Sequence, residues 1–226
     1  IFLVRVFMHI DFINFLDQLD INTDDKLYIS SDIIEILLYH KNVKTNFKAN
    51  DLIDYFLERI GKKGTLFFPT FNWDFCRGGT FDYFKTPSET GSLSRIALSR
   101  GDFLRTKHPM YSFAVKGKDE DILYELDDKS AWGPKSLFAY FHENKAKNLF
   151  IGIDYKNGFT FDHYFEEKIG VDYRYFKNFN ADYIDRDGNK NLKTYKMYVR
   201  DLKRNVMTGI SDKLDSVLIE KKAYQK

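Results

Sequence analysis

The fold of this chain is decided by residues 64–117, GTLFFPTFNWDFCRGGTFDYFKTPSETGSLSRIALSRGDFLRTKHPMYSFAVKG. The apolar run Thr65–Phe68 predicts a buried strand, which Pro69 ends because proline has no N–H for a ladder. A long aromatic loop, a helix start and a second loop with His108 follow, before the predicted strand Tyr111–Val115. Strand ends followed by loops and helix starts are where α/β proteins place their ligands.

The segment TPSETG within this stretch predicts where a helix begins. Thr86 to Glu89 matches a capping box, with threonine as the N-cap, proline in the first turn and glutamate three residues after the cap. A helix that begins there carries Gly91 in its interior, which costs about 1 kcal/mol relative to alanine. A later start, at Thr90 or Gly91, avoids that cost and lets the backbone come close to a ligand.

The pattern outside this stretch predicts an α/β fold. We expect a single three-layer domain over residues 1–226, in which a mixed central β-sheet is flanked by helices. Residues 1–21 are expected to form an N-terminal extension with a helix, and residues 178–200 a hairpin insertion around Asp187-Gly188, a strong turn signal. The other predicted elements are strands at Lys26–Ser30 and Asn148–Ile153, and helices that begin at Ser31-Asp32, at Asn50 or Asp51, at Asp119, at Ser136 and at Thr160.

Composition limits the function classes. Lys and Arg number 35 against 33 Asp and Glu, so the net charge of +2 argues against a nucleic-acid partner. One cysteine excludes an internal disulfide framework and a cysteine-based zinc site, and makes a reducing cytoplasm the simplest setting. The apolar N-terminal segment carries too many charges for a membrane span and has no small-residue cleavage site, so we expect no membrane partner.

Several short motifs occur in a distinctive order. PTF (69–71), FD (81–82), TPSETGSL (86–93) and RTKHPMYSFAVKG (105–117) are preceded by DKLYISSD (25–32) and followed by NGFTFDHYFE (157–166). Over roughly residues 22–178 the chain resembles the aminoglycoside 3-N-acetyltransferase family, also called antibiotic N-acetyltransferases. The resemblance implies direct acetyl transfer from acetyl-CoA to an amino group of an amino sugar, without a metal, by a monomer or homodimer.

Acetyl transfer to an amine needs a base, because the ammonium must lose a proton before it attacks. His163 lies three residues after Thr160 and three before Glu166, so the three side chains share one face of the predicted helix. With the resemblance, this spacing makes His163 the candidate general base. Either Glu166 or Asp162 is its orienting carboxylate, and the alternative is a histidine that is solvated or packed at the core edge.

Two further residues are catalytic candidates. Thr70, after the strand-ending proline, has a hydroxyl that can donate to a thioester carbonyl. His108 precedes Pro109 and is therefore expected in extended backbone, either near the reacting groups or bonded to the loop around it.

The phosphates of acetyl-CoA need an anion site, and helix N-termini offer free N–H groups. The resemblance implies that two such helix starts line the cofactor cleft and that Ser112 lies near the thioester or the pantetheine arm. Arg105 and Lys107 are candidates to assist a phosphate. The candidate cofactor-binding residues are Ser30, Ser31, Asp32, Ser88, Gly91, Ser92, Leu93 and Ser112.

A cationic, hydroxyl-rich acceptor needs carboxylates and hydroxyls in its cleft. A nucleotide-linked amino sugar from surface polysaccharide assembly fits as well, and would add a need for basic contacts such as Arg77 or Arg174. The candidate acceptor-binding residues are Asp74, Asp82, Thr160, Asp162 and Glu167.

Two rival functions remain open. Cys76, beside Arg77, is a candidate nucleophile for a cysteine-based acyltransferase or hydrolase, since a nearby cation lowers a thiol pKa. The second rival is a relative that binds CoA or a sugar without catalysis.

Overall fold

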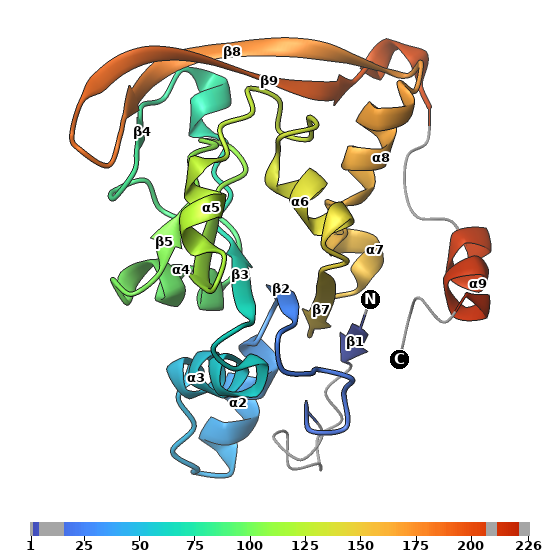
Figure 1. Ribbon diagram of the computed structural model, residues 1–226. Helices are drawn as coiled ribbons and strands as arrows, with labels where there is room; N and C mark the ends of the chain where they lie inside the picture. Colours follow the sequence, from blue (N-terminus) through green and yellow to red (C-terminus); the bar gives the residue numbers. More distant parts are fainter. Residues whose placement is uncertain (1, 5–15, 207–211, 222–226) are drawn as a thin grey trace.

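Six strands form a mixed sheet at the centre of the structure, a computed structural model that describes residues 2–4, 16–206 and 212–221 (Figure 1). They are β1 (Phe2–Val4), β2 (Lys26–Ser31), β3 (Thr65–Pro69), β5 (Leu104–Arg105), β6 (Phe113–Gly117) and β7 (Lys147–Ile151). Their order is β1-β7-β2-β3-β6-β5. The first four pair in parallel, whereas β6 is antiparallel to both β3 and β5. The predicted mixed sheet is confirmed.

The strand β3 shows how the sheet builds two cores. Successive strand residues point to opposite faces, so a strand buried on both faces is apolar throughout. Leu66 and Phe68 pack into one cluster, and Phe67 between them packs into the other. All three side chains are fully buried. The uninterrupted apolar run in the sequence is therefore the signature of a sheet with helices on both faces.

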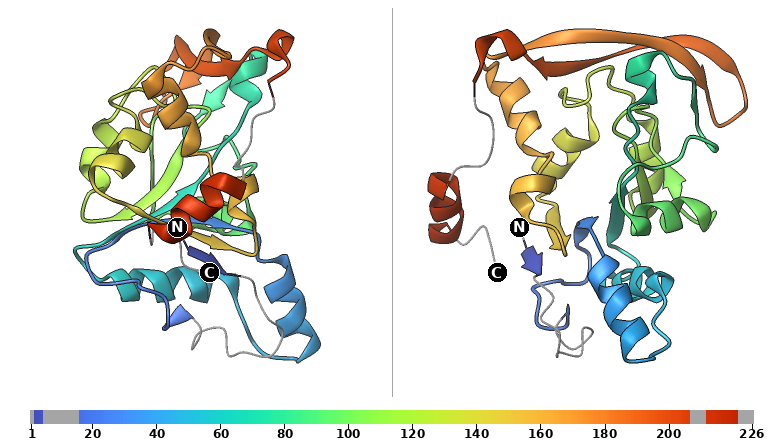
Figure 2. Two further views of the ribbon diagram at one scale, coloured as in Figure 1. Left: turned by 90° about the vertical axis from the view of Figure 1, so that its right-hand side faces the viewer. Right: turned by 180° about the vertical axis from the view of Figure 1, so that it is seen from behind.

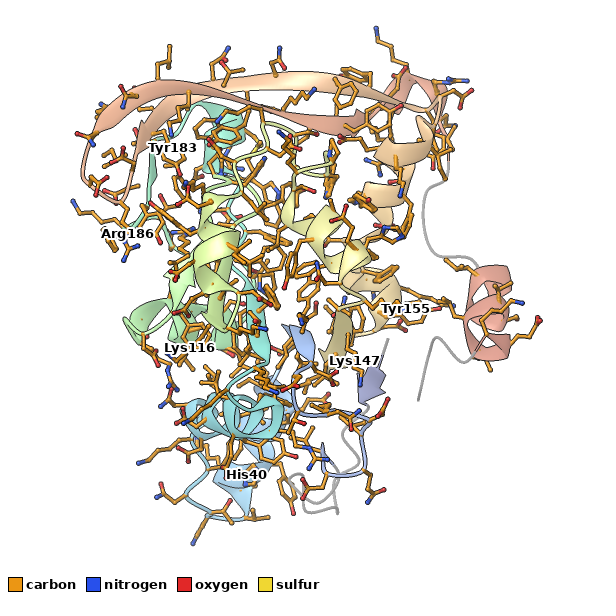
Figure 3. The ribbon with its side chains drawn as sticks, viewed as in Figure 1. His40, Lys116, Lys147, Tyr155, Tyr183 and Arg186 are labelled. Atoms are coloured by element: carbon orange, nitrogen blue, oxygen red, sulfur yellow. The ribbon has the colours of Figure 1, made fainter. Side chains whose placement is uncertain are left out.

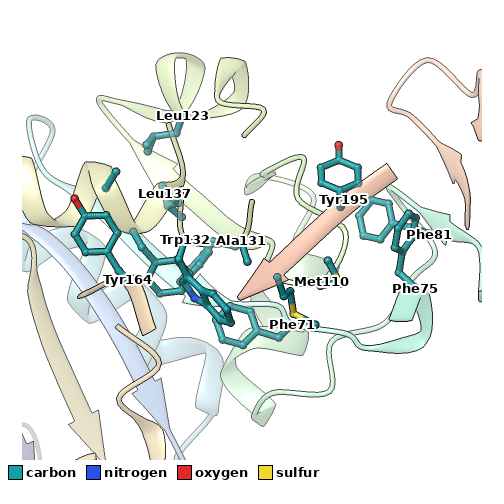
Figure 4. Packing of buried hydrophobic residues seen from close by; sticks show 14 of the residues in the cluster. Phe71, Phe75, Phe81, Met110, Leu123, Ala131, Trp132, Leu137, Tyr164 and Tyr195 are labelled. Carbon is teal, nitrogen blue, oxygen red and sulfur yellow. The ribbon is translucent and has the colours of Figure 1, made fainter. Parts of the chain in front are cut away.

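Helices cover both faces of the sheet, which confirms the predicted three-layer arrangement. One core contains side chains of three helices and the other contains side chains of three more. Figure 4 shows Trp132 among the buried side chains of the aromatic core. The first three helices are α2 (Ile34–Asn42), α3 (Ala49–Ile60) and α4 (Ser92–Ser99), and the others are α5 (Glu120–Glu125), α6 (Leu137–Glu143) and α8 (Asp162–Ile169).

A long hairpin forms most of a second, three-stranded sheet. Its strands β8 (Arg174–Ile184) and β9 (Lys190–Arg200) pair along their whole length, and β4 (Phe81–Asp82) joins β8 in parallel. Asp185 closes the turn by accepting the N–H groups of Asp187 and Asn189. The predicted hairpin is confirmed, although β8 begins four residues earlier than expected. The hairpin lies at the opposite end of the molecule from α2 and α3 (Figures 1 and 2).

The remaining elements of the described chain are short. They are η1 (Asp74–Arg77), α7 (Tyr155–Gly158), η2 (Leu202–Arg204) and α9 (Asp212–Glu220). Most of the predicted N-terminal helix falls on residues 5–15, outside the described residues. Across the described segments, no helix is both long and apolar enough to cross a bilayer.

Two predicted helix caps are wrong. Thr86 accepts the N–H of Asp82 rather than an N–H of a helix, and α4 begins only at Ser92, with Gly91 as its N-cap. The later start is thus the correct alternative. Thr160 does not cap α8, whose N-cap is Phe161 without a side-chain hydrogen bond. By contrast, Asp32 does accept the N–H of Ile34 at the start of α2, at 3.1 Å.

Candidate active site

The side chain of His163 is anchored through one ring nitrogen. Its Nδ1 lies 2.7 Å from Oε2 of Glu166, one turn along α8. A proton on Nδ1 lets the ring donate to this carboxylate and leaves a lone pair on Nε2, whereas the Arg174 guanidinium, 3.1 Å from Nδ1, can donate only to the other tautomer. Nε2 makes no hydrogen bond to any residue in the described part of the chain, and the side chain is 30% exposed.

Glu166 is held in turn by two residues that follow α8. The hydroxyl of Tyr173 donates to Oε1 at 2.8 Å, and the Arg174 guanidinium lies 2.8 Å from Oε2. Burial by itself raises the pKa of this carboxyl, but the hydrogen bonds from His163 and Tyr173 and the charge of Arg174 outweigh it and lower the pKa. Glu166 is therefore an ionised acceptor for the imidazole.

Asp162 is the weaker of the two carboxylate candidates. Its Oδ1 lies 3.2 Å from His163 Nδ1, but this buried oxygen makes no hydrogen bond in the described structure. Burial raises the pKa of Asp162. In the structure Glu166, not Asp162, makes the hydrogen bond to the histidine.

The same three side chains offer donor atoms for a cation. One ligand atom each from Asp162, His163 and Glu166 lies within 4.8 Å of the others. The guanidinium of Arg174 stands among them, 2.8 Å from Glu166 Oε2 and 3.1 Å from His163 Nδ1. A cation of the chain itself, Arg174, therefore already lies at this cluster.

A row of aromatic rings connects His163 to the end of β3. The Trp132 ring is 5.0 Å from the His163 ring and 5.0 Å from the Tyr111 ring. Tyr111 in turn packs at 4.8 Å against Phe71, two residues beyond β3. Trp132 is buried, and its Nε1–H makes no hydrogen bond in the described structure. One wall of rings therefore joins the candidate base to the strand end.

The carboxyl end of β2 is a point of close backbone approach. Gly91 has φ +64°, and a Cβ on it would stand 2.9 Å from the carbonyl oxygen of Ser31. Gly152, just after β7, has φ +67°, and its Cβ would stand 2.0 Å from the carbonyl oxygen of Asp32. Only glycine suits such positions. The start of α4 and the ends of two neighbouring parallel strands therefore meet at Ser31-Asp32.

This meeting point contains most of the predicted cofactor residues. Ser31, Gly91 and Ser92 are partly exposed there, whereas Ser30 and Leu93 are buried. No side chain caps α4, so its first backbone N–H groups are open to an anion. Ser88 is also buried and exchanges hydrogen bonds with Thr90, so it shapes the loop.

Thr70 and Ser112 form a buried pair at the end of β3. Their hydroxyls lie 2.8 Å apart, and the N–H of Thr70 donates to the carbonyl of Ser112 at 2.8 Å. Arg105 donates from Nε to the Ser112 hydroxyl and from a terminal nitrogen to the Thr70 carbonyl. Because its guanidinium is buried among such groups, the expectation that Arg105 assists a phosphate is wrong.

The imidazole of His108 is neutral and buried in the protein interior. Its Nδ1 accepts the N–H of Tyr111 at 3.1 Å, and burial lowers its pKa to about 3. The proton therefore sits on Nε2, which is buried without a hydrogen bond in the described structure and borders a cavity of ≈ 20 Å³. Such a space holds about one water molecule. His108 lies apart from the carboxylates that serve His163, with Tyr111 between them.

Three predicted acceptor residues already have local partners. Asp74 pairs with Arg77. Asp82 accepts two backbone N–H groups of its own turn. Both carboxylate oxygens of Glu167 accept from the hydroxyl of Ser130, which ties α8 to the preceding loop. The other two predicted acceptor residues, Thr160 and Asp162, lie three residues and one residue before His163 in the chain.

Cys76 does not have the surroundings of a nucleophile. Burial raises the pKa of its thiol to about 11, although Arg77 acts in the opposite direction. Its sulfur lies 3.1 Å from the sulfur of Met110. The expected lowering of the thiol pKa is therefore wrong, since desolvation exceeds the effect of the neighbouring cation.

Sequence reasoning missed the groups that hold the base. Tyr173 and Trp132 were not identified, and Arg174 was considered only for a phosphate. A signal existed for the first and last of these, because Gly170 ends α8 in a left-handed conformation and turns the chain back toward the helix. The approach of Trp132 is a long-range contact without a local signal.

Comparison with known proteins identifies the family. The model of the family described as aminoglycoside 3-N-acetyltransferase matches residues 41–222. No curated protein sequence matches this chain.

Solved structures with the same fold include several aminoglycoside acetyltransferases. AAC(3)-Xa has a TM-score of 0.72 and 17% identity, covering 93% of this chain and 80% of its own. AAC-IIIb, solved as a binary complex with CoASH, has a TM-score of 0.69 and 14% identity over 83% and 74%. AAC-VIa bound to sisomicin has a TM-score of 0.68 and 18% identity over 83% and 74%. From the family-model match and the shared fold, the chain belongs to the aminoglycoside 3-N-acetyltransferase family, a family of acyltransferases.

Proposed function

We propose that this protein is an acetyl-CoA-dependent N-acetyltransferase that modifies an amino group of an amino sugar, with His163 as the general base. One observation carries the proposal. Glu166 holds Nδ1 of His163 at 2.7 Å, while Nε2 makes no hydrogen bond in the described structure. This is the arrangement that general-base catalysis by histidine needs, because one nitrogen is fixed and the other is free to accept a proton.

The proposed reaction follows from this geometry. The acceptor nitrogen attacks the thioester carbonyl, a C–N bond forms, and one proton passes from nitrogen to Nε2. When the C–S bond breaks, the proton on Nε2 is available to the departing thiolate. His163 is transiently an imidazolium, and Glu166 and Asp162 stabilise its charge from 2.7 Å and 3.2 Å.

The cofactor is proposed to bind where α4 meets β2. Membership in the family and the CoASH complex of AAC-IIIb support acetyl-CoA as the acetyl donor. The open N–H groups at the start of α4 suit a phosphate, and Gly91 allows a ligand to approach the backbone. Thr70 and Ser112 are fully buried at the end of β3, and they are proposed to support the thioester end of the site from beneath. This chemistry also fits a cytoplasmic setting.

The acceptor is proposed to bind beside His163. The sisomicin complex of AAC-VIa supports an amino sugar as the substrate class. Asp162 suits a cationic amine, Thr160 suits a sugar hydroxyl, and both adjoin His163.

A nucleotide-linked acceptor has less support. The two arginines expected to bind its diphosphate have other partners, since Arg174 contacts Glu166 and Arg77 pairs with Asp74. The intact pair of His163 and Glu166 also favours catalysis over simple binding of CoA or a sugar.

The test is release of free thiol from acetyl-CoA. The protein is incubated with acetyl-CoA and, separately, with aminoglycosides and nucleotide-linked amino sugars, and the acetylated product is identified by mass spectrometry. We expect thiol release that requires an aminoglycoside. Calorimetric binding of CoA without thiol release from any amine would reject an enzymatic role.

A further inference from the structure

Both tryptophans of the chain pack against one tyrosine. Trp73 comes from the loop after β3 and Trp132 from the loop before α6, and the sequence contains no other tryptophan. Their rings lie 6.4 Å and 5.0 Å from the ring of Tyr111, which comes two residues before β6. The ring of Trp132 also lies 5.0 Å from that of His163. Three separate loops therefore gather aromatic rings beside the candidate base.

The hydroxyl of Tyr111 has a donor that no described residue uses. Its oxygen accepts from Nε1 of Trp73 at 3.5 Å, whereas its own O–H donates to no residue in the described part of the chain. The charges of Asp162 and Arg174 act on this phenol, so the hydroxyl lies within range of the groups around His163. Burial raises the pKa of Tyr111 to about 12, so the hydroxyl keeps its proton at neutral pH.

Several side chains around this hydroxyl are accessible to a ligand. Trp73 and Tyr111 are each partly exposed, as are Asp162 at 34% and His163 at 30%. Trp132, at 3% exposed, lies between the rings of Tyr111 and His163 on the buried side. The accessible groups on this side of the site are therefore two aromatic rings, one phenol O–H, one carboxyl group and the imidazole.

The chemistry of an amino sugar matches these groups. Its ammonium groups are attracted to the face of an aromatic ring, most strongly to that of tryptophan, and its hydroxyl and ring oxygens accept hydrogen bonds. Small-molecule sites are lined mainly by apolar and aromatic side chains, with a few polar groups that fix the orientation of the ligand. Trp73 supplies such a ring face, and Tyr111 supplies such a donor.

We propose that Trp73 and Tyr111 form a subsite for the amino-sugar acceptor. The O–H of Tyr111 donates to an oxygen of the sugar, and the face of Trp73 packs against the sugar ring and its ammonium groups. Trp132 holds Tyr111 in place from the buried side. This subsite rests on the proposed function, because it names acceptor contacts of the same site, and it decides how tightly the acceptor binds.

The test is calorimetric binding of sisomicin, the ligand of AAC-VIa, to the full chain, with CoA titrated separately. Tyr111→Phe keeps the ring and removes only the hydroxyl, so the Kd for sisomicin should rise by about threefold to tenfold, as for the loss of one hydrogen bond. Trp73→Leu removes the ring face and should raise this Kd by about as much. In both variants the Kd for CoA should stay at the wild-type value.

Two measurements separate this role from a structural one. Urea denaturation should give Tyr111→Phe a free energy of unfolding close to that of the wild type, because the ring still packs in the same place. In thiol-release assays the KM for sisomicin should rise while kcat changes by less than about twofold, as expected when only binding is lost.

Tyr124→Phe is the matched control. Tyr124 is a partly exposed tyrosine on α5, and its ring contacts Tyr83 and Lys107 rather than any residue of α8. Its substitution should change neither the Kd for sisomicin nor the Kd for CoA.

Three results would overturn the proposal. One is a wild-type protein that does not bind sisomicin, and another is a Kd for sisomicin that is unchanged in Tyr111→Phe or in Trp73→Leu. The third is a rise in the Kd for CoA alone, which would assign these rings to the coenzyme. If Tyr111→Phe does not fold, Trp73→Leu decides in the same way. Sisomicin binding that weakens in the variants, without thiol release by the wild type, would instead reject the proposed function and leave the subsite in place.

Discussion

Arg105 and Arg174 have side chains with little exposed surface, but their surroundings are opposite. Arg105 is 2% exposed and donates to three backbone carbonyls and one hydroxyl, with no carboxylate within ion-pair distance in the described structure. Burial without an anion lowers its pKa to about 10. Arg174 instead lies against Glu166 and His163, in a cluster that includes two carboxylates.

The difference separates a cation bound to groups that do not titrate from a cation bound to groups that do. The acceptors of Arg105 belong to three loops, which its guanidinium joins around the end of β3. Those acceptors do not titrate, so nothing at Arg105 changes protonation during a reaction. The partners of Arg174 do titrate, and one of them is partly exposed.

The largest effect is expected at the titrating cluster. His163→Gln should lower kcat/KM for thiol release by about 10²–10⁴-fold, the usual contribution of a general base. The matched control is His40→Gln, since His40 lies on α2, at the end of the molecule away from the hairpin (Figure 3). Its kcat/KM should stay at the wild-type value. An equal loss of kcat/KM in His163→Gln and His40→Gln would contradict a catalytic role specific to His163.

The next effect is on stability and belongs to Arg105. Arg105→Met should lower the free energy of unfolding by about 3 kcal/mol, because it leaves several buried acceptors without a donor. Urea denaturation measures this loss. Arg77→Met is the control, since Arg77 is exposed and bonded to Asp74 on the surface, and it should leave the free energy of unfolding close to the wild-type value. A stable Arg105→Met protein would contradict the structural role.

A smaller effect is expected at the proposed cofactor site. Gly91→Ala places a Cβ 2.9 Å from the carbonyl oxygen of Ser31 at a positive φ, a strain of about 1–3 kcal/mol. The segments must separate, so the Kd for CoA should rise by about tenfold, measured by calorimetry. Gly188→Ala has the same positive-φ strain in the hairpin turn, with open space around its Cβ. Gly188→Ala should therefore leave the Kd for CoA unchanged. A Kd for Gly91→Ala that equals the wild-type value would reject this site.

The smallest effect is expected at the cysteine. Cys76→Ser should keep kcat within about twofold of wild type, because a thiol outside the chemistry is dispensable. Burial raises the pKa of this thiol to about 11, so alkylation should be slow at neutral pH and accelerate as pH approaches that value. Abolished turnover in Cys76→Ser would restore the covalent mechanism.

The sheet was predictable because its strands are local patterns. The run before Pro69 has no polar interruption, and the structure buries it on both faces. The loop at Thr86 was not predictable in the same way, since its side chain has two possible partners. A helix N–H and the N–H of Asp82 are equally available in sequence, and the fold brings only the second within 2.7 Å.

The candidate site was predictable where it lies on one helix. His163 and Glu166 are three residues apart, and helical geometry alone brings them together. Arg174 required knowledge of the turn after Gly170, and Trp132 required the tertiary packing of a distant loop. Sequence spacing therefore found the base and its carboxylate, but not the residues that fix the charge and the ring.

The most direct measurement of the base is chemical rescue of His163→Gly. Thiol release from acetyl-CoA is followed with one accepted aminoglycoside while imidazole is added. If His163 accepts the proton, the variant is nearly inactive alone, and its rate rises in proportion to the concentration of neutral imidazole. A variant that turns over at the wild-type rate, with no response to imidazole, would contradict the assignment.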